Sequence, residues 1–138
     1  MLIRAGTLID GTGEPSKEDV GIRVEDEKIV SVDDYSKMDK GEDEPEIDAS
    51  KLTVLPGLVE AHAHLLGNGD PEGDAFFDTF VSNSAGKSAL NSFHHALLNL
   101  EAGFTTIRDA GSRDYVDVAL KEMIDEGKFI GPNLVVSG

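Results

Sequence analysis

Residues 53–65 read TVLPGLVEAHAHL, an apolar run that ends in two histidines separated by one residue. Side chains alternate between the two faces of a β-strand, so a strand here places His62 and His64 on one face and the two neighbouring alanines on the other. Neutral imidazole is the commonest ligand of transition metals. The spacing therefore predicts a metal site at His62 and His64, although two histidines near a strand end also occur without any metal.

Turn-forming residues bound this strand on both sides. They are Pro56 and Gly57 before it, and Gly67, Gly69, Pro71 and Gly73 after it. The strand is therefore short, and its histidines lie at its C-terminal end. In open α/β sheets and in β/α barrels this end of the strands carries the functional sites, so we expect a site here.

Three segments of the chain resemble the amidohydrolase superfamily. PGLVEAHAHL (56–65) resembles the metal-binding first barrel strand of that superfamily. EAGFTTIRDAG (101–111) and GKFIGPNLVVSG (127–138) narrow the resemblance to the imidazolonepropionase-like branch, which includes amidohydrolase-type Xaa-Pro dipeptidases. The segments occur in the family's order. One departure is Glu60, where the family more usually has aspartate.

The resemblance implies an α/β fold, namely the N-terminal part of a metal-dependent (β/α)8 TIM-barrel hydrolase. Residues 1–52 would be strands of a small β-sandwich, and residues 53–138 the first three strands and two helices of the barrel. An eight-stranded barrel needs about 250 residues. Because the chain has 138 residues, we expect the barrel to be incomplete in it.

The resemblance also implies a chemistry. A divalent metal, zinc, held by His62 and His64, would activate water to hydrolyse a carbon–nitrogen bond of a small-molecule amide, either a cyclic amide or a dipeptide-like substrate. The family's other metal ligands and its catalytic aspartate come from later strands. We therefore expect no catalytic residue within this chain and no activity of the chain alone, and the substrate, the identity of the metal and the number of metal ions stay open.

Three further residues are candidates to orient the metal ligands or to contact substrate: Glu60, Arg108 and Asp109. Asp109 follows the predicted strand at residues 104–108, on the same side of a parallel sheet as the histidines. It has an alternative role, which is to hydrogen-bond the backbone of the turn at Gly111. Arg108 likewise has the alternative of an ion pair with a nearby acid.

Two alternative functions are considered beside the hydrolase. One is a non-catalytic metal-binding or interaction domain, complete at 138 residues, but an unclosed parallel sheet would leave it with an unpaired edge strand. The other is a metal-dependent phosphoesterase, because some of those enzymes also open with His-x-His. The segment at residues 101–111 favours the amidohydrolase.

Hydrophobic periodicity predicts the remaining elements. Strands are expected at residues 2–9, 20–24, 28–32, 104–108 and 133–137, helices at 85–100 and 113–126, and loops at 33–46 and 67–74. The strand, helix, strand, helix, strand order from residue 53 onward is typical of a parallel sheet. Acidic residues in the loop at 67–74 lack the spacing of an EF-hand, so we expect this loop to cover the strand end.

Details of the two helices follow from the same patterns. Leu90, Phe93, Leu97 and Leu100 form an apolar stripe on the first helix. His94 and His95 lie off this stripe, so we expect both to be solvated rather than metal ligands. Gly103 and Gly127 are expected to end the helices, and Ser112 is expected to cap the second.

The composition limits the partners. The chain has 27 acidic and 12 basic residues and a formal net charge of −15, which argues against nucleic acid or an anionic membrane. Fifteen acidic residues lie between Asp10 and Asp48 and the other twelve are spread over the rest, which favours adaptation to high salt as a hypothesis. With no cysteine, no signal peptide and no run of transmembrane length, we expect a cytoplasmic protein, and a homo-oligomer stays open.

Overall fold

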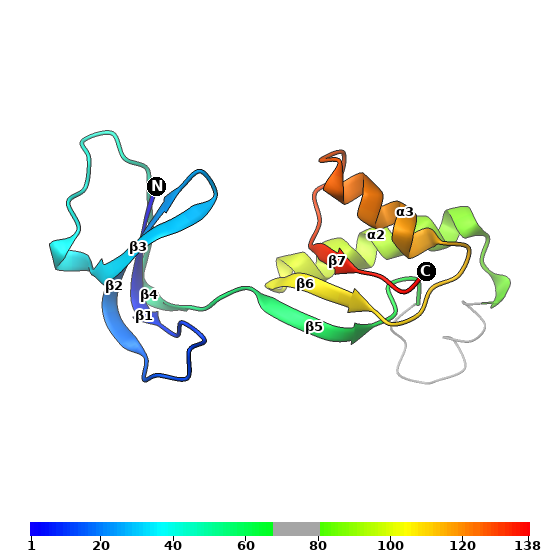
Figure 1. Ribbon diagram of the computed structural model, residues 1–138, viewed down its shortest axis with the longest axis horizontal. Coiled ribbons are helices and arrows are strands. Elements are labelled where there is room, and N and C mark those ends of the chain that lie inside the picture. The colour runs from blue at the N-terminus through cyan, green and yellow to red at the C-terminus, as the bar shows by residue number, and fades with distance from the viewer. Residues whose placement is uncertain (68–80) are drawn as a thin grey trace. The chain divides into compact units, whose positions relative to one another are not determined.

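The computed structural model describes residues 1–67 and 81–138. They form two compact units, Met1–Pro56 and Gly57–Gly138 (Figure 1). After Gly67, the loop expected over the strand end lies outside the described residues.

The first unit is built on one mixed sheet with the strand order β3-β2-β1-β4. Its strands are β1 (Leu2–Leu8), β2 (Lys17–Glu25), β3 (Lys28–Asp34) and β4 (Glu46–Val54). A short 3-10 helix, η1 (Tyr35–Lys37), follows β3. β1 pairs antiparallel with β2 and parallel with β4, and β2 pairs antiparallel with β3. Among the residues that the structure describes, the first unit has this single sheet, where strands of a small β-sandwich were expected.

β4 was not predicted as a separate strand, because the polar and charged residues of EIDASKLTV hide its alternation. Val54 pairs with Leu8 of β1, so β4 continues through the first residues of the apolar run. The first unit extends to Pro56, whereas the sequence predicted a domain boundary after residue 52.

The core of the first unit is formed by side chains of β1 and β2. Ala5, Leu8, Val20 and Ile22 are its buried members. At the neighbouring Gly6, β1 and β4 approach so closely that an added Cβ would lie 2.3 Å from the Ser50 carbonyl oxygen. The pairing of the two strands is irregular between Ala5 and Thr7. Glycine is therefore required here by the space between the strands.

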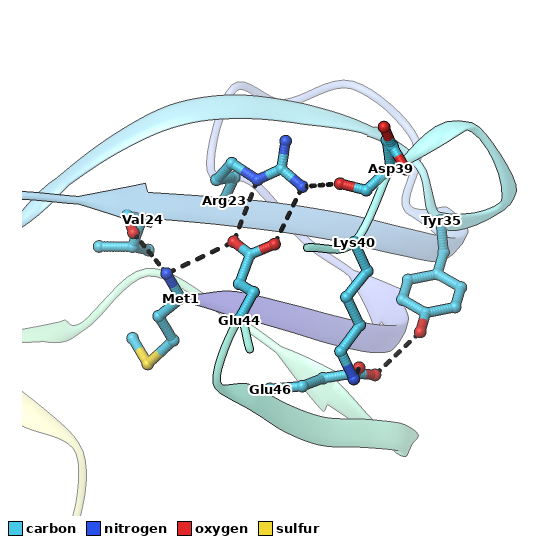
Figure 2. Close-up of polar contacts among 8 residues, drawn as sticks. All are labelled: Met1, Arg23, Val24, Tyr35, Asp39, Lys40, Glu44 and Glu46. Carbon is cyan, nitrogen blue, oxygen red and sulfur yellow. Dashed lines mark hydrogen bonds and ion pairs between the residues drawn. The ribbon is translucent and has the colours of Figure 1, made fainter. Parts of the chain in front are cut away.

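The Glu44 carboxylate contacts two cationic groups at one end of this sheet (Figure 2). Its carboxylate accepts hydrogen bonds of 3.2 Å from both Nε and a terminal nitrogen of Arg23. The N-terminal ammonium lies 3.5 Å from the same carboxylate and donates a 3.0 Å hydrogen bond to the Val24 carbonyl. Arg23 also donates to the Asp39 carbonyl. These contacts fasten the loop before β4 to β2.

Glu46, the first residue of β4, holds a second group of side chains (Figure 2). It accepts a 2.9 Å hydrogen bond from the Tyr35 hydroxyl and pairs with the ammonium of Lys40. The hydrogen bonds from Lys40 and then Tyr35 lower the pKa of Glu46 below its ordinary value, because both favour the carboxylate.

The second unit is an open, three-stranded parallel sheet in the order β5-β6-β7. Its elements are β5 (Leu58–Ala63), α2 (Ala85–Glu101), β6 (Phe104–Asp109), α3 (Val116–Asp125) and β7 (Asn133–Val135). Two successive crossovers of the same hand place both helices on one face of the sheet (Figure 1). The predicted element order is confirmed, with a shorter last strand.

The core of the second unit lies between the sheet and its two helices. Leu65, Ala96, Ile107, Leu120 and Leu134 are its fully buried members. Along β5 the side chains are exposed or half-buried among the described residues, and Val59 is 63% exposed. The strand that carries the histidines is therefore only thinly packed.

The helices differ from expectation in two details. Leu90, predicted on the apolar stripe of α2, is 72% exposed, whereas the small residues Ser88, Ser92 and Ala96 are buried. Small side chains let the helix approach its neighbours closely, so fit decides which face packs. α3 begins after Tyr115 in a left-handed conformation, so the predicted cap at Ser112 is wrong.

Both helices end as predicted. Ala102 closes α2 and is followed by Gly103 at φ +96°, and α3 is followed by Gly127 at φ +69°. Glycine adopts this left-handed conformation without the steric cost of a Cβ. No helix in the described part of the chain is long and apolar enough to cross a membrane.

We predict that Gly6→Ala destabilises the chain by about 1–3 kcal/mol, because the new methyl group must displace the β4 backbone. Gly41→Ala is the matched control, since an added Cβ there makes an ordinary contact of 3.6 Å with Glu44. It should stay within about 0.5 kcal/mol of the wild type. Urea unfolding followed by circular dichroism measures both, and equal stabilities of the two variants would contradict the prediction.

The lowered pKa of Glu46 predicts a pH dependence of stability. A carboxylate with a lower pKa in the folded chain stabilises the fold above its unfolded pKa, and the stabilisation disappears as the pH falls through the folded pKa. Glu46→Gln should therefore lower the protection of β1 and β4 at pH 7 and reduce its loss on acidification to about pH 3.

Amide hydrogen exchange in β1 and β4 measures this effect in the first unit alone. Glu42→Gln, at an exposed carboxylate of the preceding loop, removes the same charge and serves as the control. A pH response of Glu46→Gln that matches the wild type would show that the contacts of Glu46 do not stabilise the sheet.

Candidate metal centre

His62 lies on β5 and His64 directly follows it. Their ring centroids are 5.2 Å apart and the ring planes meet at 77°, so the two imidazoles are adjacent as strand alternation predicted. Ala63, between them, packs against the core under the helices. His62 therefore projects from the opposite face of the sheet.

A contact with the turn that follows β6 fixes the tautomer of His64. Its Nδ1 lies 3.2 Å from the carbonyl oxygen of Gly111. A carbonyl oxygen only accepts hydrogen bonds, so Nδ1 carries the proton and donates it. The neutral ring then has its lone pair on Nε2, which is the arrangement of a metal-binding histidine oriented by a backbone carbonyl.

Gly111 approaches the His64 ring closely. A Cβ added at Gly111 would lie 3.2 Å from Cε1 of that ring, tighter than ordinary van der Waals contact. The small residue lets its own carbonyl reach Nδ1. The sequence segment EAGFTTIRDAG thus contributes to the candidate centre through its last glycine.

Asp109 connects the ends of β5 and β6. Its side chain is 1% exposed, one carboxylate oxygen accepts from the Gly111 N–H at 3.2 Å, and the other faces the Leu65 N–H at 3.4 Å. Burial raises the pKa of Asp109, with a further increase from the charge of Asp117, while the two backbone hydrogen bonds and His64 act in the opposite direction.

These contacts confirm the predicted alternative in which Asp109 binds the turn at Gly111. They also link Asp109 to His64 through two residues. Leu65 directly follows His64 in the chain, and the carbonyl oxygen of Gly111 accepts a hydrogen bond from the His64 ring. Asp109 therefore supports the position of His64 through the backbone.

Glu60 and Arg108 both contact the backbone of β5. Glu60 accepts a 2.9 Å hydrogen bond from the His62 N–H, and Arg108 donates a 3.3 Å hydrogen bond to the Ala61 carbonyl. No ion pair joins Arg108 to an acid within residues 1–67 and 81–138, so the predicted pairing is absent there. Both side chains hold the strand that carries the histidines.

His95 differs from its prediction. His94 is exposed as expected, but His95 is half-buried and its Nδ1 lies 2.7 Å from the Leu65 carbonyl oxygen. His95 also lines a pocket of about 350 Å³ beside the end of β5, together with Ala63, His64, Leu65, Gly67, Leu98 and Asn99. A sequence signal existed, because Ser88, Ser92, His95 and Asn99 form a small and polar stripe at helical spacing.

The residues present fit two positions in the coordination shell of a metal ion. The two imidazoles are adjacent, and the Gly111 contact leaves the lone pair of His64 on Nε2. Within the residues that the structure describes, no cluster of three or more His, Cys, Asp or Glu side chains is placed to hold a metal. Because a catalytic zinc ion usually has three protein ligands, this geometry supplies part of a site.

Comparisons with known proteins agree with this geometry. Residues 53–138 match the model of the Amidohydrolase family. A dihydroorotase from Bacillus pumilus is 39% identical over 64 residues, which are 46% of this chain and 14% of that enzyme.

Solved structures extend the similarity to both units. A Xaa-Pro dipeptidase with methionine bound in its active site superposes with a TM-score of 0.87 at 28% identity, over 99% of this chain and 32% of that chain. Molinate hydrolase superposes with a TM-score of 0.80 at 25% identity, over 99% of this chain and 29% of that chain. The chain spans about a third of the length of these structures.

The family match covers more than half of the chain and includes both histidines, the strand that carries them and the two following strands. The predicted resemblance to the amidohydrolase superfamily is thereby confirmed. This chain belongs to the amidohydrolase family.

Proposed function

We propose that this chain contributes metal ligands and scaffold to a metal-dependent amidohydrolase that hydrolyses carbon–nitrogen bonds. The observation that carries the proposal is the adjacency of His62 and His64, with His64 oriented by the Gly111 carbonyl. In a member of this family, such a pair at the C-terminal end of a parallel strand is suited to binding a divalent metal.

The similar proteins support the same bond class. The Xaa-Pro dipeptidase, by its name, acts on a dipeptide, and its structure covers nearly the whole of this chain. Dihydroorotase is a further relative in sequence. These similarities favour a cyclic amide or a dipeptide-like substrate over a phosphoester, and they favour an enzyme over a non-catalytic binding domain.

The residues of this chain would divide the work as follows. His62 and His64 would bind the metal, and Gly111 and Asp109 would keep the ring of His64 in place. A divalent ion such as zinc would supply Lewis-acid polarisation of the amide carbonyl and activation of water. Glu60 and Arg108 would hold the backbone of β5 on either side of His62.

We further propose that the 138-residue chain does not catalyse the reaction alone. Its described residues bring together two imidazoles, whereas a catalytic zinc usually has three protein ligands and an open position for water. Proton transfer at the leaving nitrogen also needs a group close to the substrate. These requirements would be met by residues outside the described site.

Zinc titration calorimetry on this chain tests the metal ligands. We expect weak binding, because each ligand missing from a preformed site removes favourable binding free energy. Replacing both His62 and His64 with alanine should weaken binding by more than about 100-fold. His94→Ala removes an exposed histidine and serves as the control, which should bind as the wild type does.

Binding should also weaken as the solution is acidified, because coordination needs the neutral imidazole. Unchanged affinity in the double variant would refute the assignment of His62 and His64. A loss of affinity in His94→Ala as large as in the double variant would show that zinc binds nonspecifically to surface histidines.

Hydrolysis assays with a Xaa-Pro dipeptide and with dihydroorotate test the second part of the proposal. We expect no turnover by the zinc-loaded chain above that of its His62→Ala/His64→Ala variant, because the described residues supply only two ligands. Zinc-dependent turnover that disappears in the double variant would show that the site is already complete in this chain.

A further inference from the structure

The last feature of the site without an assigned role is the contact between His95 on α2 and the residue that follows His64. The Nδ1 of His95 lies 2.7 Å from the Leu65 carbonyl oxygen, and Leu65 is 2% exposed. We infer that His95 is a positioning residue, which orients His64 for metal binding through the Leu65 peptide. The inference rests on the proposed function of His64.

The first step concerns which ring nitrogen of His95 carries a hydrogen atom. The Leu65 carbonyl only accepts hydrogen bonds, so the Nδ1 of His95 must donate. This contact joins residues 30 positions apart in the sequence and connects α2 to the end of β5. Leu65 is buried, and a buried carbonyl that loses its hydrogen-bond donor is not compensated by water, so breaking this contact is costly.

The second step concerns the hydrogen bonds that hold the backbone next to His64. The peptide group on the N-terminal side of Leu65 points its N–H at Asp109, and the next peptide group gives its carbonyl to His95. The His64 carbonyl accepts a 3.0 Å hydrogen bond from the Gly67 N–H, which closes a turn. The backbone just after His64 is thus held by the helix on one side and by β6 on the other.

The third step relates this backbone to the imidazole. The Nδ1 of His64 reaches Gly111, whose N–H binds the same carboxylate that faces Leu65. Displacement of Leu65 would therefore move the Cα of His64 relative to the acceptor of its ring. The direction of Nε2 depends on that relation, because the Gly111 contact sets the orientation of the ring.

His95 is assigned to positioning rather than to coordination. In the part of the chain that the structure describes, His62, His64 and His95 do not form a cluster able to hold one metal. The role of His95 also differs from that of His94, its neighbour on α2, which is exposed. The two histidines are neighbours on one helix and differ in burial and in contact with Leu65, so they form a matched pair for substitution.

Three variants test the inference in this 138-residue chain: His95→Leu, His95→Asn and His94→Leu. Leucine removes the donor. Asparagine keeps an N–H donor at about the position of Nδ1, one bond beyond Cγ. We expect His95→Leu to weaken zinc binding by about 10-fold to 100-fold, the usual effect of losing a group that orients a ligand. His95→Asn should restore the affinity to within about threefold of the wild type, and His94→Leu should not change it.

A measurement without metal separates positioning from bulk stability. Nitrogen-15 NMR of the imidazoles reports the tautomer of His64 and the exchange of its Nδ1 proton. We expect His95→Leu to speed the exchange of that proton and to mix the tautomers of His64. His95→Asn and His94→Leu should leave both unchanged. Urea midpoints measured on the same samples show whether each variant remains folded.

Several results would overturn the inference. One is a folded His95→Leu chain with the zinc affinity and the His64 tautomer of the wild type. Another is a loss of affinity in His95→Asn equal to that in His95→Leu, which would indicate a packing role only. If His95→Leu does not fold, scalar coupling across the hydrogen bond from His95 Nδ1 to the Leu65 carbonyl decides in the wild type, and its absence refutes the inference.

The design also distinguishes this inference from the proposed function. If the wild-type chain and its His62→Ala/His64→Ala variant bind zinc equally, the metal assignment fails. The proton exchange and tautomer of His64 still report whether His95 positions the ring. If the double variant loses zinc and the His95 variants behave as the wild type does, only the role of His95 fails.

Discussion

The ends of β5 and β6 are joined by one buried carboxylate, that of Asp109. Its two oxygens receive backbone N–H groups from Leu65, which follows His64, and from Gly111, whose carbonyl contacts the His64 ring. Burial disfavours the charged form of this carboxylate and raises the pKa of Asp109, while the two backbone hydrogen bonds offset part of that effect. Few side chains could replace it, because an amide offers one oxygen and would turn an N–H toward the other donor.

The fold of the second unit was largely predictable from the sequence. Alternation and glycine breaks locate β5, and helical periodicity locates α2 and α3 between two further strands. These signals are local, so one sequence suffices to find them. β4 was harder, because its pairing with β1 depends on residues about 45 positions away and its own sequence is polar.

The candidate site was predictable only in part. The shared face of His62 and His64 follows from the two-residue period of a strand. The contacts that orient His64 do not follow from any local pattern, because Gly111 is 47 residues away and Asp109 is 44 residues from the Leu65 that it binds. The contact of His95 was not predicted, because the buried face of a helix was inferred from its most hydrophobic residues. The packed face of α2 is instead lined by serine, alanine and histidine.

The distribution of burial along β5 explains why polar contacts matter so much here. Leu58, Val59 and His62 are exposed in the described part of the chain, and full burial begins at Leu65, after the second histidine. The side-chain packing of the strand that carries the histidines is therefore concentrated at its C-terminal end, while the rest of the strand is held by its backbone pairing with β6. Small movements of that end are not absorbed by packing elsewhere on the strand, so they pass directly to His64. The position of the imidazoles must accordingly depend on the hydrogen bonds of the Leu65 peptide more than on the apolar side chains of β5.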